Sequence, residues 1–170
     1  MEIKTTTTYT FDLVKEFSVF NIFRIKYYKL IKWIFAMLAV VGLVACVVSA
    51  VNYNNYNYFA IEFMIVFVFY FLYWVLPKKA YALAQDLEVN FVFTDDLFFT
   101  SSNRPGGRID SEYSYDQIYI LYNTPKYMYL FLNKSQSYII DKSNIDEKTL
   151  NNLEEALISK ISDKSYKNWK

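Results

Sequence analysis

The sequence predicts an α+β membrane protein: a two-helix transmembrane hairpin joined to a small antiparallel β-domain that a C-terminal amphipathic helix closes. Two observations predict the hairpin, because residues 30–77 hold two long apolar runs and only the polar segment Asn52–Asn57 separates them. A third observation predicts the β-domain, since the apolar residues after residue 80 follow the two-residue period of strands. We therefore divide the chain into residues 1–29, 30–77 and 80–164.

The first segment, residues 1–29, is expected to contain a strand and an amphipathic helix. Glu2–Tyr9 is rich in threonine and alternates weakly, which suits a short strand, although an unordered N-terminus fits the same residues. Phe11–Tyr28 carries apolar residues at helical spacing, and Thr10 can cap its first turn. Because the hairpin returns the chain to its starting side, this segment can join and pack on the β-domain.

The two apolar runs have the length of transmembrane helices. We expect spans at about residues 33–51 and 58–76, since a helix needs roughly 20 apolar residues to cross the hydrocarbon. The loop between them carries no charge, so the positive-inside rule places both termini in the cytoplasm of a multi-pass plasma-membrane protein. Pro77 is expected to end the second span. Basic and aromatic flanking residues form a membrane-interface collar, favoured over specific recognition of anionic lipid: Arg24, Lys26, Lys29, Lys32, Trp33, Lys78 and Lys79.

Glu62 is the single charged residue inside the expected spans. It lies about one turn into the second helix, so its carboxylate is expected at the membrane interface, with a proton or ion pathway as the alternative. Cys46 lies within the first apolar run and is expected to act as a small apolar side chain.

The rest of the chain is expected to form a meander of short strands in one sheet, covered by the last helix. In that helix Asn144 is the expected N-cap, and Leu153, Leu157 and Ile161 fall on one apolar stripe. Ser165–Lys170 is expected to fray. The expected strands are Glu88–Thr94, Leu97–Ser102, Glu112–Tyr122 (one strand or a bent pair), Tyr127–Leu132 and Ser137–Asp141.

Three segments of this part resemble the YcxB-like bacterial membrane protein family: Tyr113–Ile118, Tyr127–Leu132 and Tyr138–Lys142. In that family an aromatic-Ser/Thr-aromatic-Asp-Ile segment precedes an apolar strand, and an Ile-Ile-Pro-Lys segment leads into the last helix; here Asp141 stands in place of the proline. The resemblance spans nearly the whole chain and implies a fold similar to pleckstrin-homology domains, with a strongly bent sheet and a helix at one end. It implies no biochemical activity.

The loop after the second expected strand is a candidate anion or lipid-headgroup site. Arg104 and Arg108 flank Gly106 and Gly107, and guanidinium groups beside exposed backbone N–H groups can hold a phosphate. The favoured interpretation is a plain hairpin tip, in which the glycines supply positive φ.

Composition argues against catalysis and against nucleic-acid binding. The chain has no His and one Cys, so the commonest general base and cysteine-based metal sites are missing, and no cofactor is expected. After Lys79 acidic residues outnumber basic ones, which disfavours phosphate backbones. An enzyme would need a cavity that gathers Glu112, Asp116 and Asp141.

We expect a membrane-anchored cytoplasmic binding or scaffold module that holds a protein or peptide partner on an open sheet edge or groove. The alternative is an immunity-type or stress-related small membrane protein that acts through its hairpin. The expected partners are the lipid bilayer and an unknown protein or peptide. A homo-oligomer is compatible with both functions.

Overall fold

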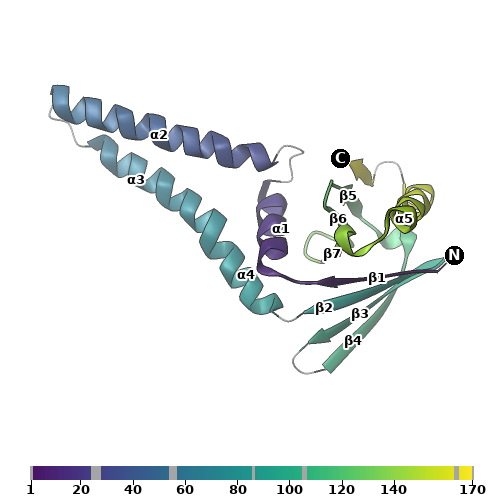
Figure 1. Cartoon of the computed structure of the whole chain (residues 1–170). Helices are drawn as coiled ribbons and strands as arrows, with labels where there is room; N and C mark the ends of the chain where they lie inside the picture. The colour runs from purple at the N-terminus through teal and green to yellow at the C-terminus, as the bar shows by residue number, and fades with distance from the viewer. Residues whose placement is uncertain are drawn as a thin grey trace. The chain divides into compact units, whose positions relative to one another are not determined.

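The computed structural model describes residues 2–23, 28–53, 57–85, 87–104, 107–162 and 165–169 (Figure 1). The chain divides into two compact units, which are described separately below. Met1–Tyr9 and Asp86–Lys170 form one of them, here called the β-unit, and Thr10–Gln85 form the other, here called the helical unit. The strand and the helix expected within residues 1–29 therefore fall in different units.

The first sheet of the β-unit contains four antiparallel strands in chain order: β1 (Ile3–Thr8), β2 (Glu88–Phe93), β3 (Leu97–Arg104) and β4 (Gly107–Ser114). In the β1–β2 pair Ile3 lies opposite Phe93 and Thr8 opposite Glu88. The N-terminal segment is thus an ordered strand that joins the β-domain. Its threonines suit this place, because Thr5 and Thr7 point to the buried face and alternate with more exposed residues.

The second sheet has the order β7-β6-β5-β8, so the expectation of a single sheet was wrong. Its strands are β5 (Ile120–Asn123), β6 (Tyr127–Phe131), β7 (Ser137–Asp141) and β8 (Tyr166–Asn168). The segment Glu112–Tyr122 is a bent pair, because the short 3₁₀ helix η2 (Tyr115–Gln117) separates β4 from β5. This corner allows the chain to leave one sheet and begin the next.

The C-terminal residues that were expected to fray instead form β8, which lies parallel to β5. The Trp169 N–H donates to the carbonyl of Asn123 at 2.7 Å, and the Trp169 ring centroid lies 4.7 Å from that of Tyr122. Backbone pairing and the contact between these two aromatic rings together hold this end of the chain.

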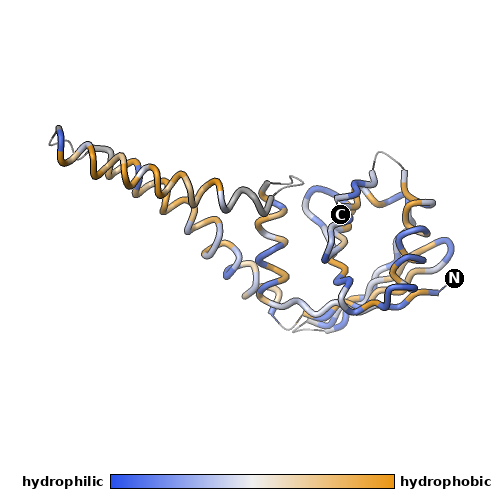
Figure 2. The backbone as a smooth tube through the Cα atoms, turned by 45° about the horizontal axis from the view of Figure 1, so that its top comes forward, coloured by the Kyte–Doolittle hydropathy of each residue, from blue (hydrophilic) through white to orange (hydrophobic). Residues whose placement is uncertain are grey.

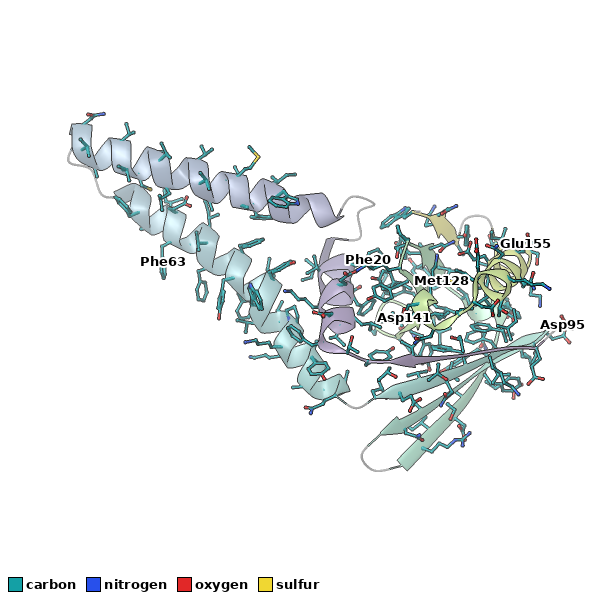
Figure 3. All side chains as sticks on the ribbon, viewed as in Figure 1. Phe20, Phe63, Asp95, Met128, Asp141 and Glu155 are labelled. Carbon is teal, nitrogen blue, oxygen red and sulfur yellow. The ribbon has the colours of Figure 1, made fainter. Side chains whose placement is uncertain are left out.

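The core of the β-unit lies on one face of the first sheet, whereas β5 and β6 of the second sheet are buried on both faces. Val89, Phe91 and Phe93 alternate along β2 and are buried, as the sequence predicts. Met128 of β6 is also buried, and in Figure 3 it lies inside the β-unit, whereas Asp95 and Glu155 point outward.

Helix α5 (Glu147–Lys160) covers the core with Leu153, Leu157 and the following Ile161, which confirms the expected stripe. Its N-cap is Asp146, whose carboxylate accepts a 3.0 Å hydrogen bond from the Thr149 N–H. The expected cap, Asn144, was wrong: Asn144 ends the 3₁₀ helix η3 (Lys142–Asn144), and its side-chain amide donates to the Thr6 carbonyl. Asp146 takes the role because it stands in extended conformation directly before the first helical turn.

The helical unit consists of α1 (Phe11–Phe23), α2 (Tyr28–Tyr53), α3 (Asn57–Tyr70), the π-helical turn η1 (Phe71–Val75) and α4 (Leu76–Ala84). Two helical segments, Trp33–Asn52 and Phe59–Ala84, are long and apolar enough to cross a membrane. Only 6% of the most apolar stretch of each is buried, so neither resembles the core helix of a soluble protein. Figure 2 shows hydrophobic residues along most of the length of α2 and α3.

The second long helix continues through Pro77 to Ala84. The expected end of the membrane span at Pro77 stays a prediction. Proline lacks an N–H and its ring crowds the carbonyl four residues earlier. The wider turn η1 lies directly before it, and there the Leu76 N–H bonds to the carbonyl of Phe71, five residues back. We attribute the continuation of the helix to this π turn, which relieves the crowding that would otherwise break it.

Candidate functional site

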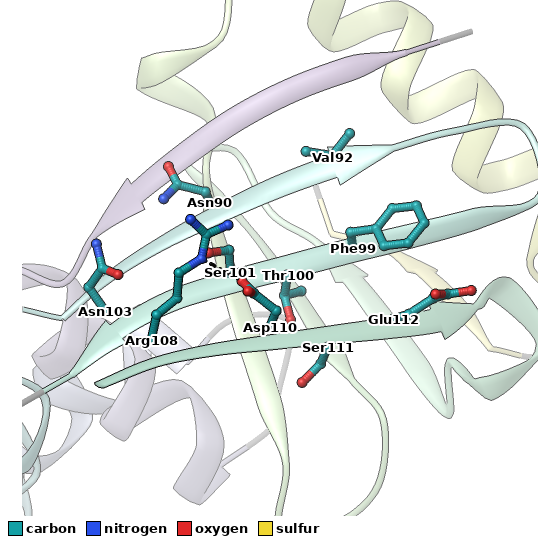
Figure 4. A pocket seen from close by; sticks show the side chains of 10 residues that line it. All are labelled: Asn90, Val92, Phe99, Thr100, Ser101, Asn103, Arg108, Asp110, Ser111 and Glu112. Atoms are coloured by element: carbon teal, nitrogen blue, oxygen red, sulfur yellow. Dashed lines mark hydrogen bonds and ion pairs between the residues drawn. The ribbon is translucent and has the colours of Figure 1, made fainter. Parts of the chain in front are cut away.

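The outer face of the first sheet carries a hollow of about 530 Å³, which we call the sheet hollow (Figure 4). Because the apolar residues of β2 point to the core, the residues between them point to this opposite face. Strand pairing sets Asn90 beside Ser101, Val92 beside Phe99, and Phe99 beside Glu112. The hollow is lined by Asn90, Val92, Phe99, Thr100, Ser101, Asn103, Arg108, Asp110, Ser111 and Glu112.

The chemistry of the sheet hollow suits binding. The Arg108 Nε lies 2.8 Å from Asp110 Oδ1, and this hydrogen bond holds the pKa of Asp110 below its usual value, with a further bond from Ser101 acting in the same direction. Amide and hydroxyl groups surround this ion pair, and Phe99 and Val92 add apolar surface. Such a mixture can accept and donate hydrogen bonds to a polypeptide while an aromatic ring provides contact area.

As far as the structure describes it, the candidate anion loop is the tip of the hairpin that joins β3 to β4. Gly107 has φ +139°, a conformation that favours glycine. Arg108 lies in the sheet hollow and pairs with Asp110. Gly106 and the side chain of Arg104 lie outside the described residues, so convergence of the two arginines stays a prediction.

The three acidic residues that an enzyme would need, Glu112, Asp116 and Asp141, do not all line the sheet hollow. Glu112 lines it, together with Asp110. Asp141 instead caps η3, accepting hydrogen bonds from the Ser143 N–H and hydroxyl. Asp116 accepts from the hydroxyl of Ser114, the residue that caps η2. Among the described residues no group of three or more His, Cys, Asp or Glu side chains is arranged to hold a metal.

Glu62 occupies a niche between α2 and α3. Its side chain is 8% exposed, and a Cβ atom added to Gly42 would lie 1.9 Å from its Oε2. Gly42 lies midway along Trp33–Asn52, so the carboxyl group is enclosed beside the middle of that helix. The expected place of Glu62 at the membrane interface stays a prediction. Within the described residues Oε1 has no hydrogen-bond partner.

The described members of the collar are exposed. Trp33 is 63% exposed, and Lys78 and Lys79 are exposed on α4. Arg24 and Lys26 lie outside the described residues, as do the side chains of Lys29 and Lys32. In the helical unit Lys15 of α1 places its Nζ 3.9 Å from the ring centroid of Trp74 and 4.3 Å from that of Tyr73. Sequence reasoning missed this cation–π contact, because nothing in the spacing links α1 to η1.

The segments that carry the family resemblance build the corner and the interior of the β-unit. Ser114 and Gln117 form a capping box around η2, and the Tyr115 hydroxyl donates to the Thr94 carbonyl at 2.7 Å. Burial, with Asp95 and Asp96 nearby, raises the pKa of Tyr115 to about 12.

The last residue of the third of these segments, Lys142, forms a buried ion pair. The Nζ of Lys142 lies 3.1 Å from Glu154 Oε1 and also donates to the amide oxygen of Asn123. Lys142 is 7% and Glu154 8% exposed, so this network ties β5, η3 and α5 together inside the unit. Sequence reasoning missed it, because a lysine next to a cap is normally solvated.

Comparison with known proteins agrees with the family resemblance of these three segments. No curated protein and no solved structure matches the chain. Residues 93–157 match the family model described as YcxB-like protein. All three segments of the sequence resemblance fall inside that range. The stretch from the end of β2 into α5 is therefore a YcxB-like domain.

Proposed function

We propose that this protein is a membrane-anchored binding module: its two long helices cross the plasma membrane as a hairpin, and its β-unit holds a polypeptide partner in the sheet hollow on the cytoplasmic side. The observation that carries the binding role is the sheet hollow itself, a concave surface that mixes hydrogen-bonding groups with an accessible aromatic ring. The absence of histidine from the sequence supports binding over catalysis.

Membrane anchoring is supported by the exposure of apolar side chains on the two long helices. Residues such as Met37, Val51 and Phe63 are each more than 65% exposed, and water would penalise so large an apolar surface. Figure 3 shows Phe63 directed away from the helix pair. The basic flanks and the uncharged connection between the helices support cytoplasmic termini.

A relation to pleckstrin-homology domains belongs to the same proposal. Two four-stranded sheets joined by a tight corner, followed by a helix after β7, support it. Such domains are general binding scaffolds, so the fold alone would not name the ligand.

Selection of peptides on the full chain in lipid nanodiscs tests the binding role. Peptides from a random-sequence display library should be enriched over empty nanodiscs, and Phe99→Ala should weaken their binding by about tenfold, as for an aromatic anchor. Tyr119→Ala is the matched control, since Tyr119 is an exposed aromatic residue outside the sheet hollow. The proposal fails if no peptide is enriched, or if the selected peptides bind Phe99→Ala as tightly as the unchanged protein.

A second function, in which the hairpin itself is the working part of an immunity-type or stress-related protein, is favoured by Glu62. An ionisable side chain enclosed between membrane helices costs stability and is retained mainly where it has a role. The two functions can be separated in cells that depend on the protein. If Glu62→Gln loses the phenotype and Phe99→Ala keeps it, the hairpin is the working part. If Phe99→Ala loses the phenotype and Glu62→Gln keeps it, the binding module is the working part.

A further inference from the structure

Strand β4 leaves one of its edges unpaired. The first sheet has the order β1-β2-β3-β4, and among the described strands only β3 pairs with β4. Most of its side chains are exposed, including Ile109 at 51%. An edge of this kind offers a row of backbone N–H and C=O groups to another strand.

Charged residues of both signs lie along this edge on the side of the sheet hollow, one basic followed by two acidic. Arg108, Asp110 and Glu112 share that side, since alternate residues of a strand point to the same face. A guard against unwanted pairing is effective when its charges repel a second copy. Here a basic residue and an acidic residue are neighbours on one face, so two copies of the strand can complement each other.

One antiparallel register satisfies this complementarity. When Ile109 lies opposite Ile109 of a second copy, Arg108 of each copy faces Asp110 of the other, and the two isoleucines meet on the opposite face. Shifting the register by two residues sets Arg108 opposite Glu112 in two symmetric pairs but also sets Asp110 opposite Asp110, and the next such shift sets Asp110 opposite Glu112. Both shifts bring like charges together, which destabilises a cross-strand pair.

We propose that β4 is a homodimerisation strand: two copies pair antiparallel through Gly107–Ser111 about a twofold axis at Ile109. The two first sheets then form one continuous sheet, and the two sheet hollows lie side by side on its outer face. This interface does not require that the hollow takes a ligand, so it goes beyond the proposed binding role. Confinement of both copies to one membrane, which rests on that proposal, would raise their effective concentration.

Cysteine cross-linking of the full chain in lipid membranes tests the register. In a Cys46→Ala background, Ile109→Cys should form an intermolecular disulfide under mild oxidation, because residues directly opposite each other lie within bonding reach. Tyr119→Cys is the matched control, since Tyr119 is 53% exposed but lies outside β4. The inference is overturned if the two variants cross-link equally or if neither does.

Charge exchange tests the interface without cysteine. Arg108→Asp alone and Asp110→Arg alone should each weaken the dimer by about tenfold, because each puts like charges in both symmetric pairs. The double variant Arg108→Asp/Asp110→Arg restores opposite charges and should restore the dimer, measured by sedimentation in detergent. A double variant that stays as monomeric as the single variants would contradict the proposed register. Phe99→Ala should leave the dimer unchanged, so failure of the hollow and failure of the edge remain distinguishable.

Discussion

At the scale of single residues, the contact between Gly42 and Glu62 sets how closely α2 and α3 approach. A Cβ added at residue 42 would meet the Glu62 carboxyl, 1.9 Å away, so a larger residue there would force the carboxyl to move. The same carboxyl carries an oxygen without a hydrogen-bond partner among the described residues. The pair therefore combines a steric requirement with a polar group that the helix pair encloses at a cost.

Gly42→Ala should destabilise the helical unit by about 1–3 kcal/mol, the cost of overpacking a close contact. Adding Glu62→Ala should recover most of this loss, since it removes the group that the new methyl meets. Thermal unfolding of the four variants in detergent gives the coupling energy. Ala45→Val, at an exposed position of α2, should have little effect. Losses that simply add in the double variant would show that the two residues do not limit each other.

Tyr115 makes the β-unit sensitive to alkali. Burial raises its pKa from 10 to about 12, so the folded state favours the neutral phenol. Its contribution to stability is complete below pH 10 and is lost as the pH rises from about 10 toward 12, where the unfolded chain ionises first. Tyr115→Phe should be less stable than the unchanged protein near neutral pH by about 1 kcal/mol, because the bond to the Thr94 carbonyl is lost.

The measurement is chemical unfolding of the full chain in detergent between pH 8 and 12. Above pH 10 the stability of Tyr115→Phe should fall less steeply than that of the unchanged protein, and the two curves should converge. Tyr119→Phe, which changes an exposed phenol, should keep the original slope. Parallel curves for Tyr115→Phe and the unchanged protein would contradict the assignment.

At the scale of elements, the buried pair Lys142–Glu154 links η3 to α5. Lys142→Met leaves Glu154 as an uncompensated buried charge and should cost about 3–5 kcal/mol of folding free energy. The double variant Lys142→Met/Glu154→Leu replaces both charges with apolar groups and should recover most of that loss. Urea unfolding checks both. If the double variant is less stable than Lys142→Met, the pair contributes attraction beyond mutual neutralisation.

Elements that depend on local sequence could be predicted, and those that depend on distant partners could not. The boundaries of β7 and the alternation of β2 follow from side-chain period and turn residues. Strand β8 could not be foreseen, because a strand of three residues gains its stability from pairing with β5 and from the contact between Trp169 and Tyr122. The continuation of the helix through Pro77 depends on a π turn, which the pattern of residues does not indicate.

The candidate site was foreseen only in part, for a similar reason. Arg108 was singled out from its loop, and its partner Asp110 is two residues away on the same strand. Asn90, Phe99 and Ser101 were missed, although strand alternation already placed Asn90 opposite the buried face of β2. What the sequence lacked was the pairing register that brings β2, β3 and β4 together around one hollow.

At the scale of the whole molecule, the proposed function requires that the helical unit spans the membrane and that the β-unit lies in the cytoplasm. Labelling of single cysteines in intact bacterial cells with a membrane-impermeant maleimide tests this most directly. Asn52→Cys, at the end of α2, and Ser135→Cys, in the exposed turn between β6 and β7, are placed in a Cys46→Ala background. The native Cys46, 2% exposed, serves as a position that should stay unlabelled.

The account predicts that Asn52→Cys is labelled in intact cells and that Ser135→Cys is labelled only after the membrane is opened. Labelling of Ser135→Cys in intact cells, or labelling of Asn52→Cys only after opening, would contradict a hairpin that spans the membrane with the β-unit inside.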